Sequence, residues 1–371
     1  MADKFQITEI SADFSHAGTK ATADFADVAE RLGFKKIPVR MVTTRPGTLA
    51  KIERQIGFRK EWAKVFEAVT PGALVLLQEP FHYQQLTRES ILRRMKAEKN
   101  VRFISVVHDI EALRKFRDSS YYKKEFRTML DLADVMIVHN HAMYDYMRTF
   151  DVPSEKLIVL QIFDYLQRDR VDVPLPDFAR SITIAGNLDP VKCGYIGELD
   201  RLTGLNINLY GPNFKPFVND RTAAKGEMEK KEGTIQDNEI LRINYKGVLP
   251  PDKIPHALTE GFGLVWDGNT VKTCGGDAGN YLRYNSPHKL SLYLSSGLPV
   301  VLWREAAEAA FIEEHKAGIT VDSLLDLKGK LDRISEADYL EMAGNAAKIG
   351  KKMRRGGYAE EALQSAMHSL V

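Results

Sequence analysis

The sequence is poor in cysteine and contains no long apolar run. Its 371 residues include only two cysteines, Cys193 and Cys274, so a disulfide framework is excluded and a reducing compartment is expected. No apolar run approaches the ~20 residues that span a bilayer. The opening stretch, MADKFQITEI, lacks the apolar core of a signal peptide. We therefore expect a cytoplasmic protein, and we leave open a peripheral contact with the inner face of the membrane.

The motifs of several common enzyme classes are also missing. Neither half of the chain has G-x-G-x-x-G after a strand, which disfavours a dinucleotide oxidoreductase. The phosphate-binding loop G-x-x-x-x-G-K-[ST] and the hydrolase motif G-x-S-x-G are absent as well. The two cysteines are not spaced with histidine pairs as zinc ligands would be. A formal net charge of only +2 gives no indication of a nucleic-acid partner.

What the sequence does contain is an alternation of short apolar strands and amphipathic helices. Fully apolar strands separated by helices are typical of parallel sheets that are covered on both faces. The alternation restarts after a polar, proline-bearing stretch at 167–178. We therefore predict an α/β protein with two Rossmann-like domains that face a central cleft. The predicted strands are 7–10, 36–42, 73–77, 101–107, 135–138, 157–160, 182–185, 207–210, 243–246, 262–266, 298–303 and 319–321.

The domain boundaries follow from this pattern. We expect an N-terminal domain at 1–166, a C-terminal domain at 167–345, and a final helix at 346–371 that packs back toward the N-terminal domain. Two stretches break the alternation. Residues 219–238 are dense in charge and predict a mobile insertion, and the glycine-rich stretch 268–279 predicts a flexible loop that acts as a lid.

The loops that follow the strands of the second domain carry glycines and basic residues. Glycine lets backbone N–H groups approach a phosphate closely, and a helix N-terminus favours an anion. Pro287 suits the first turn of a helix, whereas His288 and Lys289 oppose the helix dipole there by ~0.3–1 kcal/mol. A bound diphosphate would explain both cations. The alternative is ordinary capping by Asn285 or Ser286, with Lys289 solvated and His288 hydrogen-bonded.

Four segments resemble one group of bacterial transferases. They are Y-N-x-P-H-K-x-S-L-Y-L-x-x-G-x-P-V at 284–300, V-H-D-I-E-x-L-R at 107–114, V-H-N-x-x-M-x-x-Y at 138–146, and I-F-D-Y at 162–165. Together they resemble GT-B glycosyltransferases of the β-1,6-galactofuranosyltransferase-like group, which is similar to the streptococcal glucosyltransferase that extends adhesin O-glycans. The resemblance spans nearly the whole chain. It implies a UDP-sugar donor held mainly by the C-terminal domain, with no metal and no further cofactor.

The resemblance also implies roles for individual residues. Lys289 should meet the diphosphate, and the loop that begins with Gly186 and Asn187 and contains Lys192 should approach it from another side. Gly18 and Lys20 should face the sugar and the acceptor. The remaining expected donor-site residues are Tyr210, Lys246, Gly247, Leu249, Asn280, Tyr284, Asn285 and His288.

The implied reaction moves a hexose, galactofuranose or glucose, onto a glycan, lipid-linked or glycoprotein acceptor in cell-surface polysaccharide or glycoprotein synthesis. The family names imply inversion, which needs a general base on the acceptor hydroxyl. The candidates are Asp109, after a buried strand, and Asp13 or His16, after the first strand. Asp109 has an alternative role as a helix cap.

Three further points stay open at the level of sequence. The chain could be a non-catalytic partner that stabilises another transferase. It could also form a homo-oligomer. Basic and aromatic residues at 93–102 and 114–124 could contact an anionic membrane, although each cluster also fits a solvated basic surface.

Overall fold

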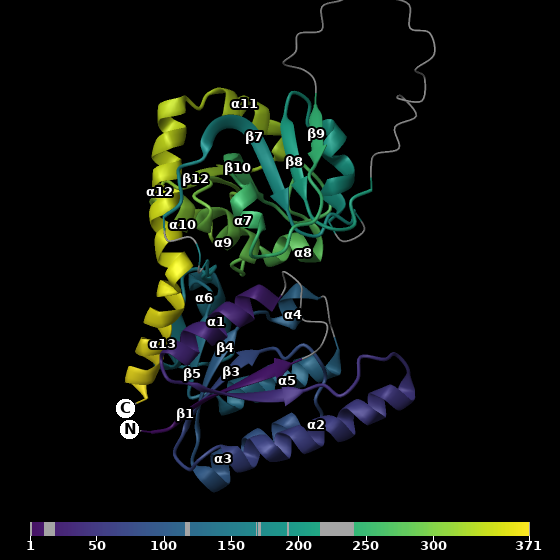
Figure 1. Cartoon of the computed structure of the whole chain (residues 1–371), viewed down its shortest axis with the longest axis vertical. Helices are drawn as coiled ribbons and strands as arrows, with labels where there is room; N and C mark the ends of the chain where they lie inside the picture. The colour runs from purple at the N-terminus through teal and green to yellow at the C-terminus, as the bar shows by residue number, and fades with distance from the viewer. Residues whose placement is uncertain are drawn as a thin grey trace, which may run out of the picture. The chain divides into compact units, whose positions relative to one another are not determined.

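The chain folds into two units, each built on a parallel sheet of six strands (Figure 1). The computed structural model describes residues 2–10, 19–115, 119–167, 169, 172–190, 193–215 and 241–370. The N-terminal unit comprises Met1–Val171, Arg283–Ser291 and Lys351–Val371, and the C-terminal unit comprises Asp172–Leu282 and Leu292–Gly350. The predicted fold class of two Rossmann-like domains is confirmed. Asp13, His16, Gly18, Lys192 and the stretch 219–238 lie outside the described residues.

The sheet of the N-terminal unit has the strand order β2-β1-β3-β4-β5-β6. Chain order therefore reverses between β1 and β3, and such a reversal opens a crevice at the carboxyl ends of the strands. The strands are β1 (Lys4–Ile10), β2 (Lys35–Arg40), β3 (Leu74–Glu79), β4 (Arg102–Val107), β5 (Val135–Val138) and β6 (Leu157–Val159). The helices are α1 (Lys20–Arg31), α2 (Thr48–Ala68), α3 (Arg88–Lys99), α4 (Glu111–Arg114), α5 (Ser120–Leu132), α6 (His141–Arg148) and α13 (Gly357–Ser369).

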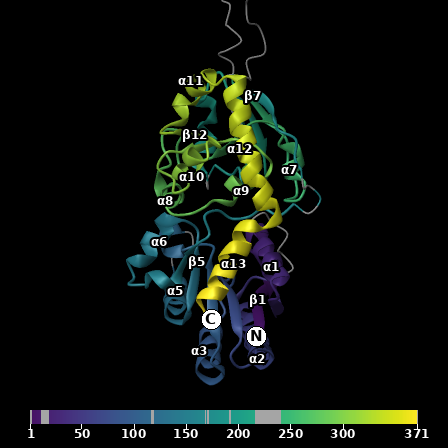
Figure 2. The same cartoon turned by 90° about the vertical axis from the view of Figure 1, so that its left-hand side faces the viewer.

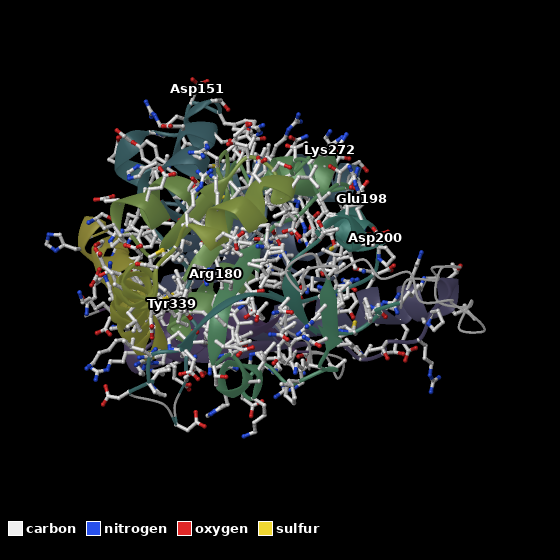
Figure 3. All side chains as sticks on the ribbon, turned by 90° about the horizontal axis from the view of Figure 1, so that it is seen from above. Asp151, Arg180, Glu198, Asp200, Lys272 and Tyr339 are labelled. Atoms are coloured by element: carbon white, nitrogen blue, oxygen red, sulfur yellow. The ribbon has the colours of Figure 1, made fainter. Side chains whose placement is uncertain are left out.

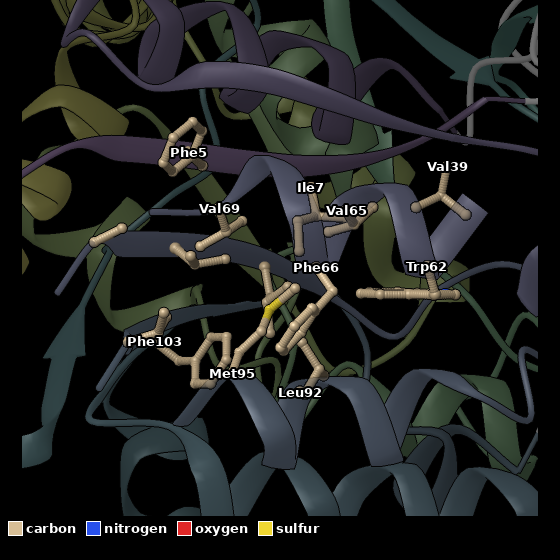
Figure 4. Packing of buried hydrophobic residues seen from close by; sticks show 14 of the residues in the cluster. Phe5, Ile7, Val39, Trp62, Val65, Phe66, Val69, Leu92, Met95 and Phe103 are labelled. Atoms are coloured by element: carbon tan, nitrogen blue, oxygen red, sulfur yellow. The ribbon is translucent and has the colours of Figure 1, made fainter. Parts of the chain in front are cut away.

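One face of this sheet is covered by α2 and α3. Apolar side chains from the second half of α2 pack against β1, β3 and α3, and Trp62 is fully buried among them (Figure 4). The indole N–H of Trp62 donates to Gln85 Oε1 at 2.7 Å, so this core also fixes the segment that follows β3. Helix α13 contacts α1, β5 and β6 (Figure 2).

The sheet of the C-terminal unit has the strand order β12-β11-β10-β7-β8-β9, so chain order reverses between β7 and β10. The strands are β7 (Asp177–Ala185), β8 (Asn206–Tyr210), β9 (Arg242–Tyr245), β10 (Glu260–Val265), β11 (Val300–Trp303) and β12 (Gly318–Val321). The helices are α7 (Ile254–Ala257), α8 (Gly276–Tyr281), α10 (Ala309–Glu314) and α11 (Leu327–Asp332). Two more helices, α9 (His288–Ser295) and α12 (Glu336–Arg355), are divided between the two units, at Ser291 and at Gly350. Tyr339 on α12 packs beside β7 and β10, and its hydroxyl donates to Gly261 O at 2.9 Å (Figure 3).

The glycine-rich stretch 268–279 is anchored by buried side chains and a hydrogen bond. Val271 and Cys274 are fully buried, and α8 begins at Gly276. Glu198 Oε2 accepts the backbone N–H of Val271 at 3.1 Å, beside Lys272 (Figure 3). Glycine density suggested few anchors, whereas two side chains of the stretch are buried, one hydrogen bond holds Val271 and α8 begins within it. Its flexibility and its role as a lid stay predictions.

Candidate functional site

A cavity of about 650 Å³ lies in the N-terminal unit, at the carboxyl ends of β1, β3 and β4. This is the place where chain order reverses, which is where open α/β sheets bind ligands. Its size falls within the range of small-molecule sites. The lining includes Glu9, Gln78, His82, Tyr83, His108, Asp109, Arg114, Phe163, Asn285, Ser286 and His288.

Asp109 follows β4 directly and lines this cavity. Its Oδ2 accepts a hydrogen bond from Arg114 Nη1 at 2.6 Å, and its side chain is 29% exposed. The next helix, α4, has Ile110 at its N-cap position and no side-chain capping bond there. The geometry therefore leaves the carboxylate of Asp109 at the cavity wall, where it can meet a ligand hydroxyl.

His108 is oriented by a chain of hydrogen bonds. Gln78 Nε2 donates to Thr22 O at 3.0 Å, which turns Gln78 Oε1 toward His108 Nε2 at 2.6 Å. His108 therefore carries its proton on Nε2, and its ring stacks on Phe163 at 5.0 Å. Burial, together with the nearby His139 and His288, lowers the pKa of His108 to about 3. The ring is neutral at physiological pH.

Two further histidines are held by the segments that carry the resemblance. His139 Nδ1 accepts the backbone N–H of Ser286 at 3.0 Å, and burial lowers the pKa of His139 to about 4. His288 stacks on Tyr165 at 4.9 Å, and its Nε2 donates to Asp164 O at 3.2 Å. Burial, together with repulsion from Lys20, lowers the pKa of His288 to about 4. His288 thus adds no positive charge at the start of α9.

Two polar atoms at the cavity wall have no partner. Asn285 Oδ1 and Ser286 Oγ are buried and make no hydrogen bond with any described residue. Both residues line the cavity, and Ser286 is only 3% exposed. Since buried polar atoms are nearly always paired, these two atoms are suited to a polar ligand.

The sequence analysis missed Glu9. Its carboxylate accepts the backbone N–H groups of His82 at 2.7 Å and Tyr83 at 3.2 Å, and the Gln85 side-chain amide at 2.8 Å. Burial raises the pKa of Glu9 despite these bonds and the nearby charge of Arg88. An acidic residue at the carboxyl end of the first strand is the signal that could have identified it.

The turn held by Glu9 supplies an aromatic wall. The rings of His82 and Tyr83 meet edge to face at 4.7 Å, and both residues line the cavity. The Tyr122 hydroxyl donates to His82 O at 3.1 Å, and Gln85 N donates to the Tyr121 hydroxyl at 2.8 Å. Bonds from three directions thus fix the turn.

Lys20 does not line this cavity. Its ammonium group pairs with Asp24, donates to Leu166 O at 3.0 Å, and lies over the Tyr165 ring at 4.7 Å from its centre. These contacts use its charge inside the N-terminal unit, whereas the sequence predicted that it faces the sugar and the acceptor. Tyr284, Asn285, His288 and Lys289 belong to the same unit, and Tyr284 packs edge to face on Tyr146.

In the C-terminal unit, the turns after three neighbouring strands are joined. Gly186 N donates to Tyr210 O and Gly211 N donates to Gly247 O, each at 2.9 Å. All three glycines have positive φ, at 142°, 144° and 84°. A Cβ at Gly211 would lie 1.7 Å from Gly186 O, so only glycine fits there.

The other predicted donor-site residues of this unit lie at or near these turns. Asn187 Oδ1 accepts from Asn213 Nδ2 at 2.9 Å, and the Tyr210 hydroxyl donates to Ala257 O at 3.3 Å. Lys246 is exposed and Leu249 is partly buried, both after β9, whereas Asn280 is exposed on α8.

Two features are absent from the part of the chain that the structure describes. No three His, Cys, Asp or Glu side chains of the described ranges are grouped as a metal site would require. Among the described helices, none combines the length and the apolar character needed to cross a membrane.

Comparisons with known sequences agree with this architecture. The profile "Glucosyltransferase 3-like, N-terminal domain" matches residues 4–162, and "Glucosyltransferase 3-like, C-terminal domain" matches 182–366. The chain is 31% identical to "Beta-1,6-galactofuranosyltransferase WbbI" of Escherichia coli (strain K12) over 270 residues, 72% of each chain. It is 22% identical to "Glucosyltransferase 3" of Streptococcus gordonii over 354 residues, 95% of this chain and 94% of that one.

Solved structures show the same fold. Anabaena Alr3699/HepE in complex with UDP and glucose superposes with a TM-score of 0.59 at 12% identity, covering 99% of this chain and 100% of that chain. The apo lipopolysaccharide outer core galactosyltransferase WaaB superposes with a TM-score of 0.60 at 10% identity, with the same coverage. The predicted family resemblance and the predicted enzyme class are confirmed, and a non-catalytic role is not favoured. The chain belongs to the glucosyltransferase 3-like family and is a glycosyltransferase of the GT-B fold.

Proposed function

We propose that this enzyme transfers a hexose, galactofuranose or glucose, from a UDP-sugar to a glycan hydroxyl with inversion at the anomeric carbon. The observation that carries the proposal is the cavity of the N-terminal unit, because it places Asp109, two unpartnered polar atoms and an aromatic wall around a sugar-sized space. The names of the two relatives support galactofuranose and glucose as the transferred sugars. We assign the reaction to cell-surface polysaccharide or glycoprotein synthesis.

The donor is proposed to bind at the turns after β7, β8 and β9. Gly186 and Gly211 carry no side chain, so a nucleotide can approach the backbone of these turns closely. Lys289 belongs to the N-terminal unit and is kept as the cation proposed for the diphosphate, because the family resemblance implies it and because His288 is neutral. Charge that develops on the departing UDP is then stabilised by Lys289 and backbone donors, without a metal ion.

The acceptor is proposed to bind in the cavity. The rings of His82 and Tyr83 offer apolar surface to the C–H groups of a sugar. Asn285 Oδ1 can accept a hydrogen bond from a sugar hydroxyl, and Ser286 Oγ can donate or accept one. A sugar would thereby satisfy two atoms that the protein leaves unpaired.

Asp109 is the proposed general base. It lines the cavity beside His108, whose pKa of about 3 makes it too weak a base for this step. Removal of a proton from the acceptor hydroxyl by Asp109 would let the oxygen attack the anomeric carbon as the bond to UDP breaks. Arg114 holds the carboxylate in place through its bond to Oδ2.

The donor assignment is tested by calorimetry with UDP on Lys289→Ala. We expect the affinity for UDP to fall at least tenfold, because a cation that meets the diphosphate is removed. The matched control is Lys272→Ala, which removes an exposed lysine of the C-terminal unit. Unchanged UDP affinity in Lys289→Ala would remove Lys289 from the donor site.

The sugar and the stereochemistry are tested by transfer assays with UDP-galactofuranose, UDP-glucose and UDP-galactose. Proton NMR of the product gives the anomeric configuration, and β-linked product from an α-linked donor is expected. Transfer in the presence of EDTA should equal transfer without it. α-Linked product would contradict inversion, and loss of activity that Mg²⁺ or Mn²⁺ restores would contradict the metal-independent mechanism.

A further inference from the structure

Helix α2 packs in two different ways along its 21 residues. Its second half buries Phe58, Trp62 and Val65 in the core of the N-terminal unit (Figure 4). Its first half extends past the edge of the sheet of that unit (Figure 1). Between Thr48 and Gly57, only Ala50 and Gly57 are buried, so half of a long helix contributes little to the core.

The exposed side of this first half is apolar. Leu49 is 83% exposed, Ile52 is 53% exposed and Ile56 is 54% exposed. Spacings of three and four residues place these side chains on one face of the helix. A helix that served only as a solvated surface would carry polar residues on that face.

Two further apolar side chains extend this surface. Val42, 54% exposed, packs beside α2 where a Cβ at Gly57 would lie 2.8 Å from its methyl groups. Leu86, 67% exposed, is bound to the helix through its backbone N–H, which donates to Gln55 Oε1 at 3.0 Å. We call Val42, Leu49, Ile52, Ile56 and Leu86 the α2 surface. Twelve large apolar side chains are exposed among the described residues, and five of them belong to the α2 surface. They are therefore clustered, whereas single exposed apolar side chains scattered over a surface are normal.

Basic residues flank the α2 surface. The segment from Arg45 to Lys60 holds five basic side chains and one acidic side chain, a net charge of +4. The basic residues are Arg45, Lys51, Arg54, Arg59 and Lys60, and none forms an ion pair with any described residue. By contrast, Arg93, Arg94 and Lys96 on α3 are paired with acidic neighbours. The unpaired positive charge therefore coincides with the apolar surface.

We propose that the α2 surface docks the enzyme on an anionic lipid bilayer. Its apolar side chains would enter the interface between headgroups and acyl chains, and the flanking cations would contact lipid phosphates. Charge favours this occupant over a second copy of the chain, because a two-fold contact would bring two groups of unpaired cations together. The proposal does not depend on the donor or acceptor assignments, since no residue of the α2 surface lines the cavity.

The test is flotation of the full-length enzyme with vesicles of phosphatidylcholine alone or with about one third phosphatidylglycerol. We expect binding to the anionic vesicles at low salt, at least tenfold weaker binding to neutral vesicles, and release at high salt. The double variant Ile52→Ser, Ile56→Ser should bind anionic vesicles at least tenfold more weakly. Leu325→Ser, Leu340→Ser is the matched control, because it alters two exposed apolar residues of the C-terminal unit.

Two readouts make the result decisive. The thermal midpoint and transfer to a water-soluble acceptor should be unchanged in Ile52→Ser, Ile56→Ser, because both side chains are exposed and neither lines the cavity. The proposal is overturned if the wild-type enzyme stays unbound with both vesicle types, or if the variant binds as the wild type does. Sedimentation velocity that reveals an oligomer lost in the variant would instead assign the surface to a second copy.

Discussion

The stability of the N-terminal unit should fall as the pH rises from about 5 to about 7, because of Asp164. This carboxylate accepts the backbone N–H groups of Tyr358 at 3.3 Å and Ala359 at 2.7 Å, in the first turn of α13. Burial raises the pKa of Asp164 from 3.8 to about 7, since it outweighs these two bonds. The folded unit thus keeps a proton on Asp164 at pH values where the unfolded chain has lost it.

Proton binding to the folded and unfolded states sets the sign and the size of this change in the free energy of unfolding. Between pH 3.8 and 7, the folded state binds more protons than the unfolded state, so stability falls with rising pH. Two pH units, from 5 to 7, at 1.36 kcal/mol each correspond to a loss of about 3 kcal/mol. For a unit of this size, that loss lowers the unfolding midpoint by roughly 6–12 °C. Above pH 7 the contribution of Asp164 levels off.

Scanning calorimetry from pH 5 to pH 8 on the wild type and Asp164→Asn measures this effect. Asparagine does not titrate, so the variant should lose the dependence that Asp164 causes, at a cost of about 1 kcal/mol for one lost hydrogen bond. Asp24 and Glu9 are competing groups, because burial raises the pKa of each of them too, and both are unchanged in the variant. Equal pH slopes in the two proteins would refute the reasoning.

Two other substitutions test the site. Asp109→Asn should lower kcat by about 10²–10⁴-fold without changing the affinity for UDP, because a general base is removed. Asp151→Asn is the control. A kcat of Asp109→Asn within a factor of three of the wild type would contradict the role of Asp109 as the base. Gly211→Ala should weaken UDP binding at least tenfold and cost about 1–3 kcal/mol of stability, because φ is 144° and the new methyl would overlap Gly186 O. Calorimetry measures UDP binding and thermal melts measure stability. Gly344→Ala is the control, because the new methyl would meet no atom there. If Gly211→Ala has the same UDP affinity and stability as Gly344→Ala, the joined turns do not support UDP binding.

Much of the fold could be predicted because apolar periodicity is local. The strand predicted at 135–138 agrees with β5. β7 was predicted at 182–185 but begins at Asp177. The first four residues of that strand mix polar and apolar types and none of them is buried, so they do not continue the buried apolar run. They are strand because Asp177 pairs with Glu260 of β10. Where a strand begins can depend on its pairing with a strand distant in sequence, and the residues of the segment alone do not reveal that pairing.

The protonation states of the three buried histidines could not be predicted from the sequence, because they too depend on residues that are distant along the chain. Burial, which depends on every element around a ring, lowers the pKa of His108, His139 and His288 to about 3–4. A histidine at the start of a helix suggested a cation for a bound anion. The structure instead gives His288 a ring partner, Tyr165, and a carbonyl acceptor on Asp164. The roles proposed for the site residues stay predictions until the substitutions above are measured.

The sequence by itself determined the alternation of strands and helices, the two α/β domains and the family, because these depend on residue patterns within short segments. Only the tertiary structure decided that Asn285 and Ser286, from a segment far along the chain, line a cavity beside Asp109 and Glu9. It also decided that Lys20 is paired and that the first half of α2 is exposed. The physical reason is that a parallel sheet brings the carboxyl ends of distant strands to one edge, and burial there depends on all of them at once.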